Sequence, residues 1–271
     1  MMDYQKVGIY VDAFDVTING GFGLRYDILR KFACRDGGYP IRLNVYLAYD
    51  KKRSAEDEGY RTKTERFCEV LRDFEYKVIE IPVKHEKDEE TGTSVPAVPI
   101  NVDMAVDIMN QANDLDRLLL LSSDPSFVRL VQAVQNKGAR VELVGFDNMS
   151  EKLKKEVDMY ISGYLIPGLL PVDSPYDWGA VGSRVRGVCY DYSHSDGYGF
   201  MRYLSRLDDK LWITDSRFKD SPYKTVFAHI SQFEPNFDTS FLPSRDLIFE
   251  FDLVENEKGL IAKDIVLISA P

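Results

Sequence analysis

The sequence predicts an α/β domain followed by a small all-β barrel, and two patterns support this prediction. Up to residue 166, continuously apolar segments alternate with amphipathic segments at helical spacing, which is typical of a parallel sheet sandwiched by helices. From residue 183 onward, short β-branched or aromatic segments follow one another between Ser, Asp, Pro and Gly. The stretch PGLLPVDSPYDWG breaks the periodicity between them. We therefore expect domains over 1–166 and 183–271, joined by a linker over 167–182.

In the first domain, apolar runs bounded by polar residues predict strands at 7–11, 41–49, 77–82, 117–122, 139–146 and, at an edge, 160–166. Apolar residues at helical spacing predict helices at 24–35, 60–75, 102–114, 125–137 and 149–157. Two highly charged or proline-containing stretches, 51–59 and 83–99, are expected to be exposed loops.

The second domain contains five short strand candidates, at 183–191, 197–204, 224–230, 246–254 and 260–268. So many short strands in so few residues are typical of a small antiparallel barrel.

Composition limits the environment and the partners. The chain has 271 residues, and its three cysteines, Cys34, Cys68 and Cys189, are far apart, which indicates reduced thiols in a cytoplasmic protein. No apolar run approaches the roughly 20 residues that span a bilayer, so we expect no membrane association. The net charge of −10 argues against binding nucleic acid through phosphate contacts alone. Any such contact would use local basic patches, base stacking or metal ions.

Acidic residues gather where a site could form. Asp12 and Asp15 end the first strand, and Asp124 follows the fully apolar strand RLLLLS. Asp103 and Asp107 lie four residues apart, on one face of a helix. Ligands of parallel sheets bind beyond the carboxyl ends of the strands, and neighbouring carboxylates suit Mg²⁺ or Mn²⁺. Such ions hydrolyse phosphodiesters.

Other interpretations of these acids stay open at this point. Asp124 precedes Pro125, which is a favourable N-cap arrangement. Asp103 could cap the helix that it begins, and Asp107 could belong to a solvated face.

Aromatic residues form a second candidate site in the barrel. Alternate residues of a strand share a face, so Tyr198 and Phe200 point the same way, as do Phe227 and His229. Exposed aromatic rings on a small barrel stack on nucleic-acid bases. The alternative is that these rings form the barrel's own core.

Three segments of the first domain, VGIYVDAFDV, NVDMAVDIMNQA and LLLLSSDPSFVRLVQAVQNKGARVELVGF, together resemble a NYN domain. More narrowly, they resemble the LabA-like (DUF88) branch of the PIN-like nuclease fold, over residues 5–166. The resemblance implies a metal-dependent endoribonuclease whose catalytic, metal-binding acids are Asp12, Asp103 and Asp124, with Asp15 or Asp107 assisting. It also implies Mg²⁺ or Mn²⁺ as cofactor, and a homodimer.

The chain departs from the family pattern at two places. The D-G-x-N of the family reads Asp12-Ala13-Phe14-Asp15 here, so an acid replaces an amide. The family's S-G-D-S-D-F reads Ser122-Ser123-Asp124-Pro125-Ser126-Phe127, so the second acid and the glycine are absent.

In the second domain, RGVCYDYSHSDGYGFM, VFAHIS and RDLIFEFDLVENEKGLIAKDIVLI resemble a cold-shock domain, an OB-type barrel that binds single-stranded RNA or DNA. The resemblance implies nucleic-acid contacts by Tyr192, Tyr198, Phe200, Phe227 and His229. Two family positions are acidic here, at Asp191 and Asp196, and the segment 202–225 is longer than the family's usual turn.

The leading hypothesis is therefore a metal-dependent ribonuclease whose C-terminal domain captures single-stranded RNA. The alternatives are a catalytically inactive RNA-binding or regulatory protein that keeps the PIN-like fold, and a protein-interaction module.

Overall fold

A computed structural model describes residues 4–87, 94–97 and 99–270. The chain forms two compact units: the first contains the described residues of 1–22, 37–145 and 149–160, and the second those of 23–36, 146–148 and 161–271. No helix in the described part of the chain is long and apolar enough to cross a membrane.

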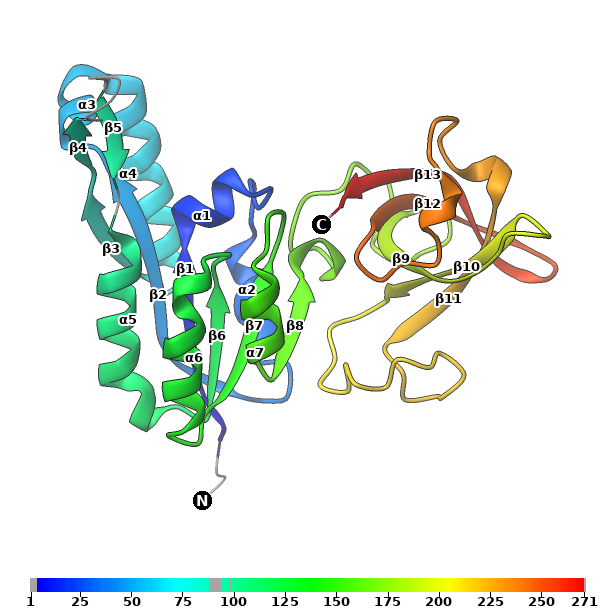
Figure 1. Ribbon diagram of the computed structural model, residues 1–271, viewed down its shortest axis with the longest axis horizontal. Coiled ribbons are helices and arrows are strands. Elements are labelled where there is room, and N and C mark those ends of the chain that lie inside the picture. Colours follow the sequence, from blue (N-terminus) through cyan, green and yellow to red (C-terminus); the bar gives the residue numbers. More distant parts are fainter. Residues whose placement is uncertain (1–3, 88–93, 98, 271) are drawn as a thin grey trace. The chain divides into compact units, whose positions relative to one another are not determined.

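A six-stranded sheet forms the centre of the α/β domain (Figure 1). In sheet order its strands are β3 (Lys77–Pro82), β2 (Tyr39–Tyr49), β1 (Lys6–Asp12), β6 (Arg117–Leu121), β7 (Arg140–Gly145) and β8 (Met159–Ser162). The pairs β3–β2, β2–β1, β1–β6 and β6–β7 are parallel. Residues 118–121 of β6 are all leucines and all buried, as expected for a central parallel strand, and the buried Arg117 pairs with Glu142 of β7 at 3.4 Å. The prediction of a parallel sheet is confirmed.

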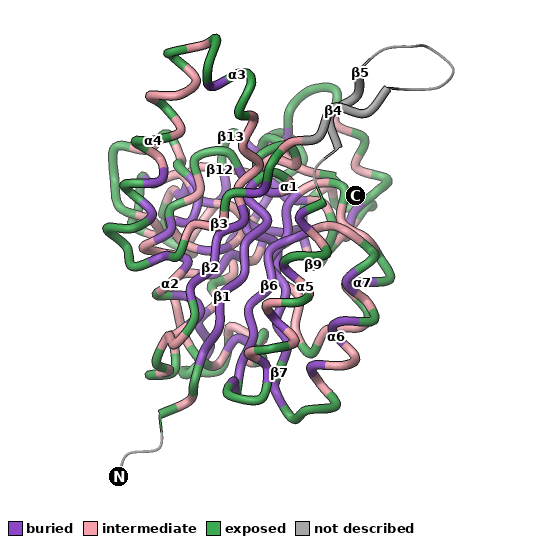
Figure 2. Tube along the Cα trace, turned by 90° about the vertical axis from the view of Figure 1, so that its left-hand side faces the viewer, coloured by how far each residue is buried: buried purple, intermediate pink, exposed green. Residues whose placement is uncertain are grey.

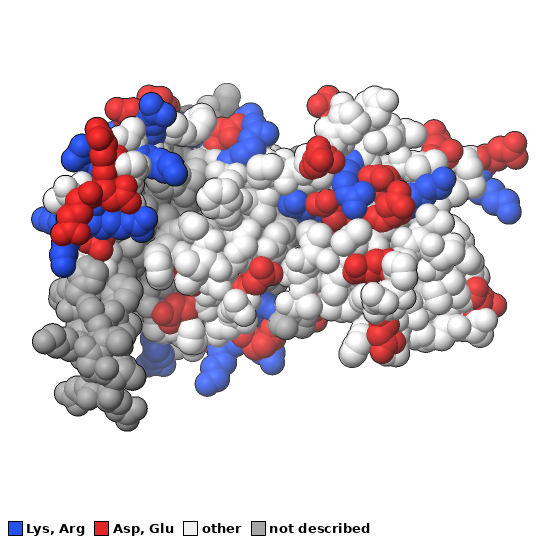
Figure 3. All heavy atoms as spheres, turned by 90° about the horizontal axis from the view of Figure 1, so that it is seen from above, with Lys and Arg blue, Asp and Glu red and all other residues white. Residues whose placement is uncertain are grey.

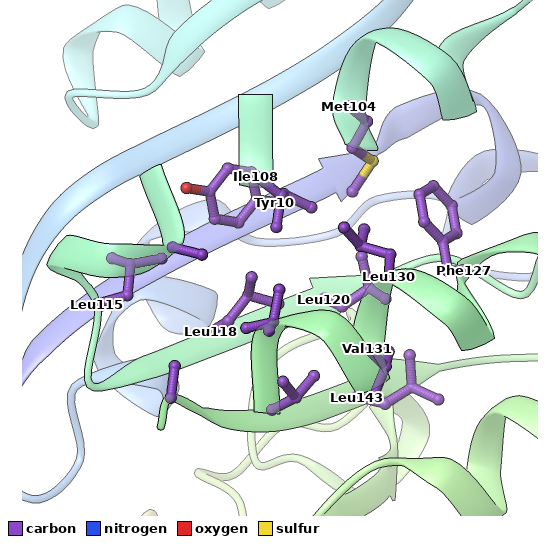
Figure 4. Packing of buried hydrophobic residues seen from close by; sticks show 14 of the residues in the cluster. Tyr10, Met104, Ile108, Leu115, Leu118, Leu120, Phe127, Leu130, Val131 and Leu143 are labelled. Atoms are coloured by element: carbon purple, nitrogen blue, oxygen red, sulfur yellow. The ribbon is translucent and has the colours of Figure 1, made fainter. Parts of the chain in front are cut away.

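Helices lie on both sides of this sheet. Figure 2 shows α4 (Glu58–Asp73) and α5 (Ile100–Gln111) on opposite sides of β1 and β2. With α5, the helices α6 (Val128–Gln135) and α7 (Glu151–Glu156) bury apolar side chains against β1, β6 and β7. Figure 4 shows this core, in which Met104 and Ile108 of α5 face Tyr10, Leu118 and Leu120 of the strands.

The short elements were predicted least well. The expected loop 51–59 contains the helix α3 (Lys51–Glu56), and the expected loop 83–99 contains the hairpin of β4 (Lys84–Lys87) and β5 (Ser94–Ala97), while residues 88–93 and 98 lie outside the described residues. The helix α1 (Ala13–Ile18) was not predicted either. Asp50 caps α3 by accepting hydrogen bonds from two backbone N–H groups, both at 3.0 Å. Of the residues in α3, only Ser54 is buried, so no apolar periodicity marked this helix.

The second unit contains a closed five-stranded barrel. Around the barrel the strands follow the order β10 (Tyr198–Leu204), β11 (Tyr223–His229), β13 (Gly259–Ser269), β12 (Ile248–Asn256) and β9 (Arg184–Ser193). The pairing of β11 with β13 is parallel, through Phe227 and Ile261. The barrel is therefore mixed, whereas the short strands had predicted an antiparallel one. A closed barrel of this kind fits the predicted OB-type domain.

The second unit also contains the helix α2 (Tyr26–Ala33) and the segment predicted as a linker. In this segment Leu169 and Leu170 are buried. The Leu169 carbonyl accepts a hydrogen bond from the Arg25 backbone at 2.9 Å, and the Pro171 carbonyl accepts one from Arg186 Nη2 of β9, also at 2.9 Å. The segment is therefore packed within its unit by apolar and polar contacts.

Candidate functional site

Asp12 ends β1 at the carboxyl edge of the sheet and caps α1. Its Oδ1 accepts hydrogen bonds from the backbone N–H groups of Phe14 (3.1 Å) and Asp15 (2.9 Å). The side chain is buried, since Asp12 is only 5% exposed. The cap therefore fixes the carboxylate beside the end of the neighbouring strand β6, which pairs with β1 up to Val11 and Leu121.

Asp124 lies just beyond the end of β6, and its carboxylate is also held by hydrogen bonds. Its Oδ1 accepts the Ser126 backbone N–H at 2.6 Å and caps a single 3₁₀ turn over Pro125–Phe127, as the N-cap interpretation predicted. Its Oδ2 accepts a short hydrogen bond from Asn101 Nδ2 at the start of α5. Partial burial raises the pKa of Asp124, but the hydrogen bonds from Ser126 and Asn101 outweigh burial and hold it below its usual value.

Asp15, in the first turn of α1, is bound on both carboxylate oxygens. It accepts hydrogen bonds from Ser123, through the backbone N–H at 2.6 Å and through Oγ at 2.5 Å. Asn19 Nδ2 donates a third at 2.9 Å. Asp15 thus links α1 to the loop after β6, and its oxygens are largely committed to this link.

The three carboxylates are close enough to influence one another. The pKa of Asp12 is raised from 3.8 to about 6, mainly by burial and also by the negative charges of Asp15 and Asp124, which together outweigh the lowering effect of the two backbone hydrogen bonds. A carboxyl group poised near neutrality among other acids is a common feature of functional sites.

The acids of α5 have different surroundings. Asp103 is exposed in the first turn, and the N-cap position is Pro99, so the alternative in which Asp103 caps this helix is wrong. Asp107 is half-buried and accepts a hydrogen bond from Tyr46 Oη at 2.8 Å, and Tyr46 Oη in turn accepts one from Asn44. Asp107 is therefore part of a polar network with β2.

The side chains at the carboxyl edge of the sheet could bind a divalent metal ion only in certain ways. Over residues 4–87, 94–97 and 99–270, no group of three or more His, Cys, Asp or Glu side chains is arranged to hold a metal ion. Mg²⁺, however, usually binds through one or two carboxylates and completes its shell with water and substrate phosphates. The pair of Asp12 and Asp124, with oxygen donors on adjacent strand ends, fits that mode of binding.

On the barrel, three rings form a surface that we name the aromatic platform: Tyr198 and Phe200 of β10 and Phe227 of β11. Tyr198 lies 5.5 Å from Phe227 and 6.4 Å from Phe200, and Phe200 lies 6.1 Å from Phe227, between ring centroids. Tyr198 is 37% exposed and the other two rings are half-buried. The platform is thus on the outer surface, not in the core. His229 pairs with Tyr198 across the strands and is exposed.

Tyr192, by contrast, lies inside the barrel. It is 8% exposed and belongs to the core, where its ring meets the edge of Phe233 at 6.4 Å. A base could not stack on this ring without opening the barrel, so we leave Tyr192 out of the aromatic platform.

Two contacts of the acids were not predicted from the sequence. Asn101 binds Asp124, and Ser123 binds Asp15. The signal for Asn101 was an amide in the first turn of a helix at the ligand-binding edge of the sheet. The signal for Ser123 was its place directly before Asp124.

The surface charge is mixed. On the face drawn in Figure 3, the described Lys and Arg side chains are interspersed with Asp and Glu, most densely over α3 and α4. With a net charge of −10, the chain offers little general attraction for a polyanion.

A six-stranded parallel sheet between helices, with the buried Asp12 and the half-buried Asp124 at its carboxyl edge, fits the PIN-like class of α/β domains. The NYN domain model matches residues 6–169, and the chain belongs to this family, a family of PIN-like nucleases. This membership supports a ribonuclease-type function. The match is to the family as a whole, and the LabA-like branch stays a prediction.

Among curated proteins, none matches the chain. A solved structure from Vibrio parahaemolyticus, described as a protein of unknown function, is similar at 19% identity with a TM-score of 0.47. The similarity covers 60% of this chain and 94% of that one.

Proposed function

We propose that the protein is a metal-dependent endoribonuclease that cleaves single-stranded RNA, with the barrel as its RNA-binding domain. One observation carries the proposal: in a NYN domain, the buried Asp12 and the hydrogen-bonded Asp124 lie together at the carboxyl edge of the sheet, and Asp12 has a raised pKa.

The residues around the acids give this pair its shape. Backbone N–H groups orient Asp12, while Asn101 and Ser126 orient Asp124. Asp12 and Asp124 would hold Mg²⁺ or Mn²⁺, with the exposed Asp103 of α5 as a third acid and Asp15 or Asp107 assisting. When bound, such an ion lowers the pKa of a coordinated water and neutralises charge on the phosphodiester. A bound cation would also stabilise the ionised form of Asp12, which burial and the neighbouring carboxylates now disfavour.

The barrel supplies the substrate affinity in this proposal. Bases of single-stranded RNA would stack on the aromatic platform, and His229 would flank them. Because the two domains share one chain, binding of RNA to the barrel would raise the effective concentration of RNA at Asp12 and Asp124. Single-stranded DNA would bind in the same way. The homodimer and the cytoplasmic location stay predictions from the sequence.

A second candidate function is an RNA-binding or regulatory protein that does not cleave. The hydrogen bonds to the acids favour it, because Asn101 already occupies one oxygen of Asp124, and Ser126 stands where the family has a second acid.

Cleavage of a labelled single-stranded RNA in Mn²⁺ or Mg²⁺ separates the two candidates. We expect metal-dependent cleavage by the wild type and a loss of at least about a hundredfold in Asp12→Asn and Asp124→Asn, because each removes a charged ligand. Asp114→Asn is the matched control, since Asp114 is an exposed acid in the 3₁₀ turn after α5.

The possible results have distinct meanings. Cleavage that survives in both variants would contradict the assignment of Asp12 and Asp124. Absence of cleavage with RNA binding intact would favour the regulatory protein. Absence of both would exclude RNA as the partner.

A further inference from the structure

The segment between β10 and β11 borders a pocket on the outer surface of the barrel. This segment, residues 205–222, is yellow in Figure 1. It is tied to the strands by hydrogen bonds from Arg202 Nη1 to the Thr214 carbonyl (3.1 Å) and between Ser216 Oγ and Thr225 Oγ1 (2.6 Å). The pocket that it forms with β9, β10 and β11 has a volume of about 540 Å³. This is within the range of small-molecule sites.

An irregularity in β9 turns two successive side chains toward this pocket. Phe200 pairs with Asp191, but the next residue, Met201, pairs with Cys189, so Tyr190 is an extra residue in β9. Such a bulge disrupts the strict alternation of side chains. Tyr190 is half-buried and Asp191 is exposed, and both line the pocket.

The walls combine aromatic, cationic and anionic groups. Phe200 belongs both to the aromatic platform and to the pocket. The Arg202 guanidinium lies 5.3 Å from the ring centroids of both Tyr190 and Tyr223, so its direction is fixed. A base stacked on Phe200 would thus have a guanidinium and a carboxylate within the same pocket.

The two carboxylates of the pocket differ in their partners. Asp215 is bound by Arg217, with Oδ2 at 2.6 Å from Nη2. The Asp191 carboxylate receives no hydrogen bond or ion pair from the residues that the structure describes. Asp191 is therefore the acceptor available to a ligand.

We propose that this pocket binds a guanine base, a specificity that rests on the proposed RNA-binding function of the barrel. The Watson–Crick edge of guanine carries two adjacent donors, N1–H and N2–H₂, which can pair with the two oxygens of one carboxylate. Its other edge carries O6 and N7, the acceptors that arginine binds. Adenine, cytosine and uracil place an acceptor beside their donor, and that acceptor would meet the negative charge of Asp191.

Binding of oligouridine, and of the same oligomer with one central guanosine, tests the proposal. Fluorescence anisotropy is measured with the whole chain in EDTA, so that the RNA is not cleaved. We expect the wild type to bind the oligomer with guanosine at least about fivefold more tightly than oligouridine, because one bidentate pair contributes discrimination of this size. Asp191→Asn should lose this preference, because an amide offers one donor and one acceptor.

Asp196→Asn is the matched control. Asp196 lies in the turn that connects β9 to β10, accepts a hydrogen bond from Ser193 Oγ at 2.6 Å and is exposed. Asp196→Asn removes the same charge from the same hairpin but leaves the pocket unchanged, because Asp196 does not line it. This variant should therefore keep the preference for guanosine. Loss of the preference in this control as well would overturn the proposal, because charge alone would then explain the effect.

Free guanosine monophosphate, measured against the other mononucleotides, identifies the source of the base. Equal wild-type affinity for both oligomers would overturn the proposal and leave RNA binding by the platform intact. If guanosine monophosphate nevertheless bound selectively, the ligand would be a free nucleotide and not RNA. No binding of either oligomer would instead refute the proposed RNA-binding function.

Discussion

The buried carboxyl group of Asp12 should make the stability of the metal-free protein depend on pH. Its pKa is about 6 in the folded protein and 3.8 ordinarily. As the pH rises, the unfolded chain therefore loses this proton first. The contribution of Asp12 to the free energy of unfolding is fully present below pH 3.8 and is lost as the pH rises through about 6.

Asp12→Asn should therefore stabilise the protein in EDTA at neutral pH, by at most about 3 kcal/mol. Asparagine also caps helices well, so the cap of α1 should survive. Chemical unfolding of both proteins, repeated from about pH 4 to about pH 7, measures the difference, which should shrink toward the acidic end. A variant that is less stable than the wild type at neutral pH would show that Asp12 is not electrostatically strained.

At the scale of single residues, the sequence predicted the positions of the acids better than their partners. Asp12 and Asp124 could be placed together because each follows an apolar strand, and the ends of parallel strands meet at one edge. The bond from Asn101 to Asp124 joins residues 23 positions apart, and no local pattern encodes such a contact. Tyr192 was predicted from the family alignment to contact nucleic acid, whereas its ring lies in the barrel core with Val185 and Cys189.

At the scale of elements, Gly199 sets how closely β9 and β10 can pack. A Cβ atom at this position would lie 2.3 Å from the Asp191 carbonyl oxygen and 3.0 Å from the Tyr192 Cα. Both are backbone atoms and cannot move aside as a flexible side chain can. The pairing of β9 with β10 thus requires glycine at position 199, the second glycine of the GYGF sequence.

Gly199→Ala should consequently destabilise the barrel by about 1–3 kcal/mol, as other overpacking substitutions do. Thermal unfolding gives the change. Gly59→Ala, in the first turns of α4, is the control, since there the new Cβ meets only Asp57 Oδ1, at 3.3 Å. Equal stability of Gly199→Ala and the wild type would mean that the strands separate at little cost.

The elements that the sequence predicts are those whose burial leaves a pattern in their own residues. The central strands β1 and β6 of the sheet are largely apolar, and the strands of the barrel alternate or are bounded by turn residues, so their burial is visible in their own sequences. The helix α3 and the hairpin of β4 and β5 have no such pattern. The parallel pairing of β11 with β13 depends on how the barrel closes, which no single strand reveals.

At the scale of the whole molecule, the net charge of −10 should limit how RNA is bound. Near the platform, Arg217 is paired with Asp215, and Arg202 is held between two tyrosine rings. Because both of these cations are already engaged within the protein, we expect stacking to supply most of the affinity. Each phosphate contact to a single strand adds about 0.7 to the slope of log affinity against log salt.

We therefore expect a shallow salt dependence, with a slope below about 2 in magnitude, and a strong dependence on the platform rings. Stacking contributes about 1–3 kcal/mol per base, so Tyr198→Ala/Phe227→Ala should weaken RNA binding at least tenfold, by about 1.4 kcal/mol or more. Phe241→Ala removes a ring that is 66% exposed and outside the platform, and it should have no effect. A steep salt dependence that the double variant leaves unchanged would instead place the RNA on a basic surface elsewhere.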